Sequence, residues 1–295
     1  MAQKQFGSAD STGRKLDIIG EYLSMYQIAL SNKNFKTLYI DGFAGSSEIP
    51  LAEHKDELFE DDTKTVISGS ADRAFQVEPP FSRYIFIDKQ KKCIDALEER
   101  FKDNPHYDRT FYIVGDANVE VQRICANEQW RSQRGVIVLD PFGSQVEWET
   151  VEAIAGTQAL DLWYLFPAGV GVYRQISKNG TIDPTHEPSI TRIYGTGEWK
   201  EAFLKPSKQG DLFGQPPNPD KNVTPESAAQ FMIERLGTVF KGGVMQEMIP
   251  LGKHAYPSFY LVFAWGNTSP KAKKLANDLS KAALKATDRR HGRTV

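Results

Sequence analysis

The sequence predicts an α/β protein of the Rossmann type, in which helices cover both faces of a mostly parallel β-sheet. Short apolar runs rich in β-branched and aromatic residues alternate with segments whose apolar residues recur every three or four positions. Runs of the first kind suit strands buried on both faces, and segments of the second kind are typical of amphipathic helices. Such alternation favours parallel strands joined by right-handed crossovers.

Five short runs in the first part of the chain predict five strands. They span residues 38–40, 84–87, 111–114, 136–139 and 160–166. Four of these runs are followed by an aspartate, directly or after one glycine, and the fifth is followed by proline. The four aspartates are Asp41, Asp88, Asp116 and Asp140.

Helical spacing of apolar residues separates most of these runs and predicts helices over residues 91–101, 118–130 and 147–155. A further amphipathic helix is expected before the first strand, where the apolar side chains share one face. These side chains are Ile18, Ile19, Tyr22, Leu23 and Tyr26.

The last third of the chain predicts two more helices and two more strands. Thr224-Pro225 and Ser269-Pro270 each open a helix, because Thr and Ser are good N-cap residues and Pro is favoured at the first helical position. Between these helices, residues 244–249 and 259–264 predict a pair of antiparallel strands. We therefore expect the parallel sheet to end with an antiparallel C-terminal strand.

Two irregular segments interrupt this pattern. An acidic insertion at about residues 46–68 follows the first strand, and Ser68-Gly69-Ser70 then begins a helix over residues 71–77. A second, helical and loop insertion at about residues 171–224 ends in a stretch rich in Pro, Gly, Lys, Asp and Asn. We expect one domain over residues 1–295 that carries both insertions.

Composition excludes several classes of protein. The chain has 295 residues, with 36 basic and 38 acidic side chains and a formal charge of -2, so it has no overall basic field for nucleic acid. Two cysteines are too few for a disulfide framework or a zinc cluster, and the five histidines lack metal-ligand spacing. No signal peptide or membrane span is visible. We expect a cytoplasmic protein without a metal or a membrane partner.

The four aspartates are expected to gather at one edge of the sheet. In open α/β sheets the ligand lies beyond the carboxyl ends of the strands, where successive loops meet. A single aspartate after a strand is an ordinary loop residue. Four of them after successive strands favour a site for a nucleoside-like ligand.

The first of these loops reads Asp41-Gly42-Phe43-Ala44-Gly45. Its small residues allow the backbone to approach a ligand closely. The loop is neither the GxGxxG motif of dinucleotide-binding proteins nor a P-loop, so it is a poor match to a phosphate site. An acid before the glycines fits the cationic end of a ligand, and the alternative is a tight turn after the strand.

The aspartates after the second and third strands each allow two interpretations. Asp88, beside Lys89, is placed to accept hydrogen bonds from ribose hydroxyls, or it caps the next helix. Asp116, beside Ala117, is placed to meet an adenine amino group, or it caps the helix that follows.

The fourth strand is followed by Asp140-Pro141-Phe142-Gly143, the most distinctive motif of the chain. An oxygen of Asp140, fixed by the rigid Pro141, would accept hydrogen bonds from a substrate amine, and Phe142 would stack on a flat ring. The alternative is a turn that closes the fourth strand.

Together these motifs resemble those of the class I S-adenosylmethionine methyltransferases. More closely, LYIDGFAGSS, YIFIDKQKKCIDALEERF, GDAN and VIVLDPFG resemble the three-Cys-motif partner protein (TcmP) family over about residues 14–180. The acidic stretch followed by Gly69-Ser70 is also similar to bacterial adenine-N6 methyltransferases that act on ribosomal RNA.

The resemblance implies a seven-stranded methyltransferase fold and S-adenosylmethionine as the cofactor. It places Asp41 and the loop from Gly42 to Gly45 at the methionine end, Asp88 at the ribose and Asp116 at the adenine edge. Residues Asp140 to Gly143 take the place of the Asp-Pro-Pro-Tyr motif of amino-methyltransferases. Here Phe142-Gly143 replaces Pro-Tyr, so the resemblance does not settle that nitrogen is the methyl acceptor.

The sequence therefore predicts a methyltransferase that acts on nucleic acid, with an adenine amine as one acceptor. The alternatives are a small-molecule or protein methyltransferase, and a cofactor-binding subunit that works with a cysteine-motif partner protein. A nicotinamide oxidoreductase also fits the fold, but the chain lacks the glycine fingerprint of that class. Tyr173, Arg174 and Lys178 follow the fifth strand at the same edge. The C-terminal segment is basic, which suits either phosphate contacts or a solvated helix face.

Overall fold

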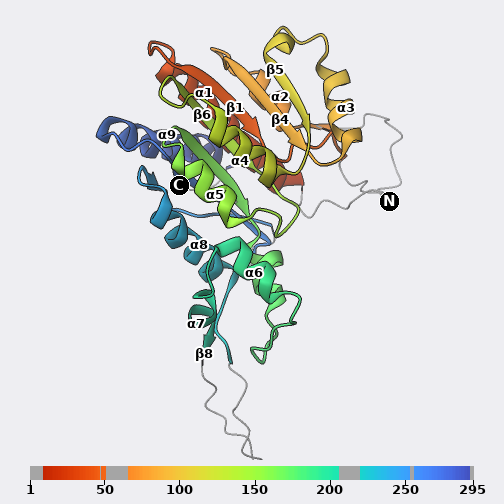
Figure 1. Cartoon of the computed structure of the whole chain (residues 1–295), viewed down its shortest axis with the longest axis vertical. Coiled ribbons are helices and arrows are strands. Elements are labelled where there is room, and N and C mark those ends of the chain that lie inside the picture. Colours follow the sequence, from red (N-terminus) through yellow and green to blue (C-terminus); the bar gives the residue numbers. More distant parts are fainter. Residues whose placement is uncertain (1–8, 47, 51–65, 206–219, 253–255, 293–295) are drawn as a thin grey trace, which may run out of the picture.

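The computed structural model describes residues 9–46, 48–50, 66–205, 220–252 and 256–292 (Figure 1). Its main sheet has the strand order β10-β12-β7-β6-β1-β4-β5, and β11 also pairs with β12. The parallel strands are β1 (Lys36–Asp41), β4 (Arg83–Asp88), β5 (Thr110–Val114), β6 (Gln133–Leu139) and β7 (Leu160–Phe166). The antiparallel strand β12 (Phe259–Trp265) pairs with β7. The predicted fold class is confirmed.

The predicted strand over residues 244–249 was wrong in one respect, because it is two short strands. They are β10 (Gly243–Val244) and β11 (Ile249–Leu251), and both pair with β12. Val244 lies opposite Ala264, and Ile249 lies opposite Leu261. Between these two pairs, the segment from β10 to β11 contains two more residues than β12 does. Gln246 and Glu247 are exposed, which indicates that the polar pair leaves the sheet edge for solvent.

Side chains of the central strands alternate between two cores, as expected for a sheet covered on both faces. In β7, Leu162 and Tyr164 pack into one core, whereas Trp163 and Leu165 pack into the other. The first core lies under α4 (Ala117–Asn127), α5 (Trp148–Gly156) and α8 (Pro225–Val239). The second lies under α1 (Ala9–Leu30), α2 (Ser70–Phe75), α3 (Lys91–Phe101) and α9 (Pro270–Arg290).

A long excursion separates β7 from α8 and extends away from the sheet (Figure 1). It contains the helical turns η2 (Ala168–Val172) and η3 (Tyr173–Gln175), then α6 (Glu187–Tyr194) and α7 (Trp199–Phe203). A short antiparallel pair, β8 (Leu204–Lys205) and β9 (Asp220–Lys221), follows. The polar segment between β8 and β9, residues 206–219, lies outside the described residues.

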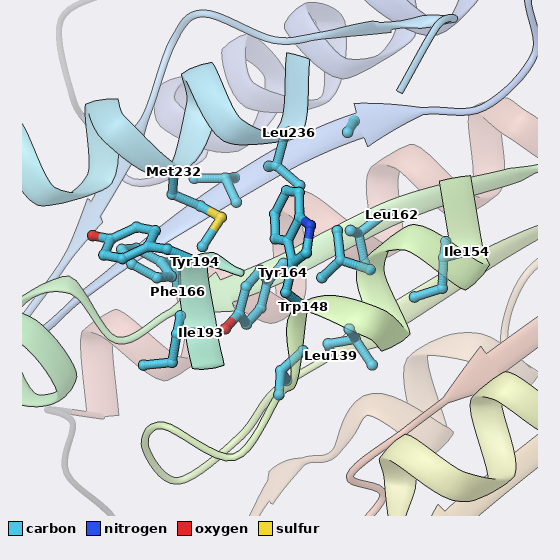
Figure 2. Close-up of a cluster of buried hydrophobic side chains, with 14 of the residues drawn as sticks. Leu139, Trp148, Ile154, Leu162, Tyr164, Phe166, Ile193, Tyr194, Met232 and Leu236 are labelled. Carbon is cyan, nitrogen blue, oxygen red and sulfur yellow. The ribbon is translucent and has the colours of Figure 1, made fainter. Parts of the chain in front are cut away.

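The excursion is joined to the sheet by a compact aromatic and aliphatic cluster (Figure 2). Trp148 of α5 and Tyr194 of α6 pack with Met232 of α8 against the face of β7 that carries Tyr164. The hydroxyl of Tyr194 donates to the carbonyl of Ala228 over 2.8 Å. Helix α6 is therefore fixed against α8 and β7.

The acidic insertion begins and ends as a β-hairpin. Its strands are β2 (Glu48–Pro50) and β3 (Val66–Ser68), which pair antiparallel. The acidic residues between them, within residues 51–65, lie outside the described residues.

A single turn, η1 (Tyr107–Arg109), precedes β5. Among the described helices, none is long and apolar enough to cross a membrane.

Candidate functional site

The candidate site lies where the chain reverses direction across the sheet. From β1 the chain passes outward to β4 and β5, and then crosses back to β6 and β7 on the other side of β1. Loops that leave β1 and β6 therefore diverge at their carboxyl ends, which opens a crevice in sheets of this kind. The sequence-predicted loops after β1, β4, β5 and β6 all begin at this edge.

The glycine loop after β1 is anchored to the strands on both sides. The Gly42 amide donates to the Val138 carbonyl over 3.0 Å, and the Ala44 amide donates to the Ile87 carbonyl over 2.9 Å. A Cβ atom on Gly42 would lie 2.7 Å from Leu139 Cδ2, so a side chain at this position would require the Leu139 side chain to move. The loop backbone is thus a fixed floor between β4 and β6.

Gly45 ends that floor with a left-handed backbone, at a φ of 60°. Its amide donates to Asp88 Oδ2 over 3.0 Å. A Cβ atom at Gly45 would meet no atom within 4 Å, and the same holds for Gly143 on the loop after β6. The loops after β1 and β6 therefore both carry a glycine that borders open space.

Asp41, at the end of β1, is only 1% exposed. Its carboxylate accepts hydrogen bonds from Ser70 Oγ over 2.6 Å and from the Phe43 amide over 3.1 Å. Burial raises the pKa of Asp41 to about 6, although the two hydrogen bonds oppose the shift. Asp41 therefore holds the loop and α2 together and carries its charge beneath the site rather than on its surface.

Asp88, at the end of β4, is half-buried and faces the glycine loop. Oδ2 accepts the Gly45 amide and Oδ1 accepts the Gln90 amide over 2.7 Å. The N-cap of α3 is Gln90, so Asp88 does not cap that helix. Each carboxylate oxygen of Asp88 keeps capacity for a second hydrogen bond.

Asp116, after β5, does cap the helix that follows it. It is the N-cap of α4, and its Oδ1 accepts the Asn118 amide over 2.9 Å, one residue beyond Ala117. The exposed Lys89 ammonium lies 3.7 Å from its Oδ2. The capping interpretation of Asp116 is thus correct, and its second oxygen remains at the edge beside Asp88.

Asp140, after β6, forms an ion pair with Lys15 of α1. Lys15 bonds to Oδ2, and Oδ1 accepts no hydrogen bond from the described residues. After Pro141, the Phe142 amide donates to Gln145 Oε1 over 2.9 Å, and the Phe142 ring is exposed. The motif is therefore a closed turn that presents one carboxylate oxygen and one aromatic ring.

The charges of Asp41, Asp140 and Lys15 act on one another. The charge of Asp140 raises the pKa of Asp41, and the charge of Lys15 lowers it. The structure thus brings together Asp41, Asp88 and Asp140 around the glycine loop. Asp116 lies further out along the same edge, beside Lys89.

Sequence patterns gave no sign of three polar side chains that hold the site. Lys15 lies on an amphipathic helix far upstream, and Ser70 had a predicted role only at the start of a helix. Asn118 of α4 donates to the Gln145 carbonyl over 2.9 Å and accepts the Glu147 amide over 2.9 Å. Asn118 therefore holds the loop after Asp140 in place. Its side chain is buried, at 9% exposure, and this burial is the one feature that distinguishes it from an ordinary helix asparagine.

A pocket lies at the opposite edge of the sheet, away from the candidate site. It holds about 70 Å³ of space for water-sized molecules between α1 and α9, next to the first residues of β6 and β7, and its lining includes Tyr26, Trp265 and the buried Asp161. It shares no residue with the carboxylate cluster.

Within the described residues, no group of three or more His, Cys, Asp or Glu side chains has a metal-ligating arrangement.

No family model and no curated protein sequence matches the chain. Several solved structures have a similar course of the backbone. A Legionella pneumophila protein is 11% identical, over 93% of this chain and 92% of its own, with a TM-score of 0.46. The magnesium protoporphyrin IX methyltransferase of Synechocystis PCC 6803, crystallised with S-adenosylmethionine, is 11% identical over 87% of this chain and 80% of its own, with a TM-score of 0.35.

A third structure is an S-adenosylmethionine-dependent methyltransferase from Clostridium acetobutylicum. It is 8% identical over 84% of this chain and 92% of its own, with a TM-score of 0.37. At such identities and scores no residue, ligand or activity of these proteins transfers to this chain. The chemistry of the site rests on its own geometry.

Proposed function

We propose that this protein is an S-adenosylmethionine-dependent methyltransferase. The observation that carries the proposal is the hydrogen bond from the Gly45 amide to Asp88 Oδ2, at the reversal point of the sheet. It fixes a carboxylate at the end of the second strand directly beside a glycine loop. In Rossmann-type folds an acid at this position accepts the hydroxyls of a ribose.

The residues present fit the adenosyl part of the cofactor. Asp88 has acceptor capacity left for two hydroxyls, and Gly45 borders open space in which a ribose can lie. Asp116 Oδ2, beside Lys89 and Ala117, remains an acceptor for an amino group at the adenine edge. This set extends along the edge from β1 to β5 in the order that a nucleoside requires.

The residues present also fit a cationic sulfur. Asp41 lies buried beneath the loop from Gly42 to Gly45, and Phe43 and Ala44 complete the floor above it. We assign Asp41 an indirect role, because its carboxylate already binds Ser70 and the Phe43 amide. The negative charge of Asp41 would attract the cationic sulfur across the loop, and this attraction is stronger because the carboxylate is shielded from solvent.

When bound, the cofactor would supply a methyl group on a cationic sulfur: an acceptor would attack the methyl carbon in line, and the neutral thioether would leave. The chain has to hold the acceptor at the correct distance and direction, since such a displacement depends chiefly on positioning. Asp140 Oδ1 is the free acceptor atom for the N–H of an amine, and it offsets the positive charge that develops on nitrogen. Pro141 and Gly143 keep the turn rigid and open, and Phe142 provides the ring against which a planar acceptor stacks.

We propose nucleic acid as the acceptor class and an adenine amine as the first atom to test. An exposed Phe142 beside a carboxylate suits a planar base with an exocyclic amine, and a paired base would have to flip out to reach it. Membership of the three-Cys-motif partner protein family belongs to the same proposal.

One observation favours a second candidate, a cofactor-binding subunit that needs a partner protein for turnover. Lys15 already occupies Oδ2 of Asp140, so half of this carboxylate is committed within the chain. A partner that displaced Lys15 would leave Oδ2 of Asp140 available to a substrate.

Calorimetry and methyl labelling separate these possibilities. We expect S-adenosylhomocysteine to bind the purified chain and NAD not to bind, and tritiated methyl groups to enter an RNA or DNA fraction rather than protein. Cofactor binding without label in any fraction would support the partner-dependent subunit. Binding of NAD in place of S-adenosylhomocysteine would overturn the proposal.

A further inference from the structure

Two tyrosines from distant parts of the chain stack beside the proposed acceptor site. The rings of Tyr173, on η3, and Tyr256, before β12, have centroids 5.7 Å apart and planes inclined by 19°. Tyr256 is 58% exposed although its ring contacts that of Tyr173. The stacked pair therefore presents an aromatic surface to solvent.

Lys221 of β9 contacts Tyr173 of this pair. Its ammonium lies 3.5 Å from the centroid of the Tyr173 ring and donates to the carbonyls of Tyr173 over 2.6 Å and of Ile176 over 2.8 Å. The cation thus holds both the ring and the turn that carries it.

Short contacts connect the pair to the loop after β6. Ser144 Oγ lies 3.4 Å from the Gly171 carbonyl, two residues before Tyr173. The Gly169 amide donates to the Ser258 carbonyl over 3.0 Å, two residues after Tyr256. Both tyrosines and the exposed Phe142 are therefore attached to one continuous set of loops at the carboxyl edge of β6 and β7.

Unpaired positive charge borders the pair. Arg174 follows Tyr173 directly and Lys178 lies four residues further on. Both side chains are exposed, and neither forms an ion pair within the described part of the chain. Aromatic faces flanked by free cations are the arrangement with which proteins bind single-stranded nucleic acid, through base stacking and phosphate contacts.

We propose that Tyr173 and Tyr256 form a stacking platform for a base of a single-stranded or flipped-out nucleic acid segment, with Arg174 and Lys178 on its phosphates. This inference rests on the proposed function, since it names the surface that holds the acceptor strand. A small neutral aromatic acceptor would use the stack and leave the two cations without a role.

The test uses the full chain, a fluorescein-labelled single-stranded oligoadenylate RNA and fluorescence anisotropy in the presence of S-adenosylhomocysteine. We expect Tyr256→Leu to weaken RNA binding by about 5- to 150-fold, the range for loss of one stacked base. Tyr256→Phe, which keeps the ring, should bind as the unaltered chain does. The matched control is Phe111→Leu, because Phe111 is 46% exposed on the edge strand β5.

Two further readouts complete the test. Arg174→Gln should reduce the dependence of RNA affinity on salt concentration, and calorimetry should give an unchanged affinity of Tyr256→Leu for S-adenosylhomocysteine. Equal RNA binding by Tyr256→Leu and the unaltered chain would overturn the platform. So would equal losses in Tyr256→Phe and Tyr256→Leu, or RNA binding that salt does not affect.

Failure of the platform and failure of the proposed function give different results. If S-adenosylhomocysteine binds and the RNA does not, the platform is wrong and the methyltransferase proposal stands. If the RNA binds through Tyr256 and S-adenosylhomocysteine does not bind, the proposed function is wrong and the platform stands as a nucleic-acid site.

Discussion

The ammonium group of Lys15, on α1, forms an ion pair with the carboxylate of Asp140, on the loop after β6. The two residues are 125 positions apart in the chain. The side chain of Lys15 is 10% exposed and that of Asp140 is 33% exposed, so the lysine depends on its partner more than the aspartate does. The pair joins the first helix to the proposed catalytic loop.

Replacement of this lysine is expected to reduce both stability and methyl transfer. In Lys15→Met the apolar stem is kept, but Asp140 loses its partner and the charge beneath the glycine loop is no longer balanced. We expect a loss of about 1–3 kcal/mol in the free energy of unfolding, because the aspartate regains only part of its hydration. Urea unfolding and tritium transfer measure the two effects.

Lys92→Met serves as the control, since Lys92 is exposed on α3 and forms no ion pair among the described residues. It should change stability by less than about 0.5 kcal/mol. If Lys15→Met transferred methyl groups as fast as the unaltered chain, Asp140 would not need this partner for its proposed role.

The contact between Gly45 and Asp88 leads to a prediction about cofactor affinity. Asp88→Asn keeps an oxygen for the Gly45 amide but replaces the other acceptor by a donor, which cannot accept a ribose hydroxyl. We expect the affinity for S-adenosylhomocysteine to fall roughly 10- to 100-fold, as for loss of a charge-assisted hydrogen bond. Calorimetric titration measures it, with Asp95→Asn on the exposed side of α3 as control. Equal affinities of Asp88→Asn and the control would remove Asp88 from the site.

Sequence patterns located the elements of the fold well because buried strands and amphipathic helices have strong local signals. The helix over residues 91–101 has the observed bounds, and the one expected at 118–130 runs from Ala117 to Asn127. The strand expected at 244–249 was divided, because the exposed pair Gln246-Glu247 forms a bulge that hydrophobicity alone does not reveal.

The candidate site was predictable only in part. The aspartates were visible because each follows a strand, and strand ends of a parallel sheet share an edge. Lys15 and Ser70 were not, since their roles arise when α1 and α2 pack against the loops after β1 and β6. Contacts between residues so far apart in the chain leave no local pattern.

The buried Asp161, at the opposite edge of the sheet, predicts a dependence of stability on pH. It is 7% exposed, and burial raises its pKa to about 7, against the hydrogen bond from the Tyr22 hydroxyl over 2.8 Å. Between pH 4 and 7 the folded chain keeps a proton that the unfolded chain has lost, so this group makes stability fall as pH rises. Above pH 7 the free energy of unfolding is lowered by the full amount, roughly 4 kcal/mol.

Asp161→Asn removes that titration but leaves an amide N–H without a partner, at a cost of about 1–3 kcal/mol. The variant should therefore be less stable than the unaltered chain near pH 4 and more stable at pH 8. Urea midpoints across this range measure the crossing, and the contribution of Asp41 cancels because both proteins contain it. A difference in stability that stays constant with pH would contradict the assignment.

The end of α6 gives a prediction about the joint between the excursion and the sheet. Gly195 caps this helix at a φ of 64°, and a Cβ atom there would overlap the ring of Trp148, which lies among Leu162, Tyr164 and Leu236 (Figure 2). Gly195→Ala therefore combines a left-handed alanine, at about 1 kcal/mol, with overpacking at about 1–3 kcal/mol. We expect unfolding at a temperature lower by roughly 5–10 °C.

Gly197→Ala separates this effect from a general loss of chain flexibility. A Cβ atom at Gly197 would meet no atom within 4 Å, and its φ lies outside the left-handed region, so the variant should unfold with the unaltered chain. Since Trp148 belongs to α5 directly after the loop that carries Asp140, a shift of its ring should also disturb that loop. Gly195→Ala is therefore expected to lose methyl transfer below its unfolding temperature, whereas retention of full activity would show that the position of the Trp148 ring does not control this loop.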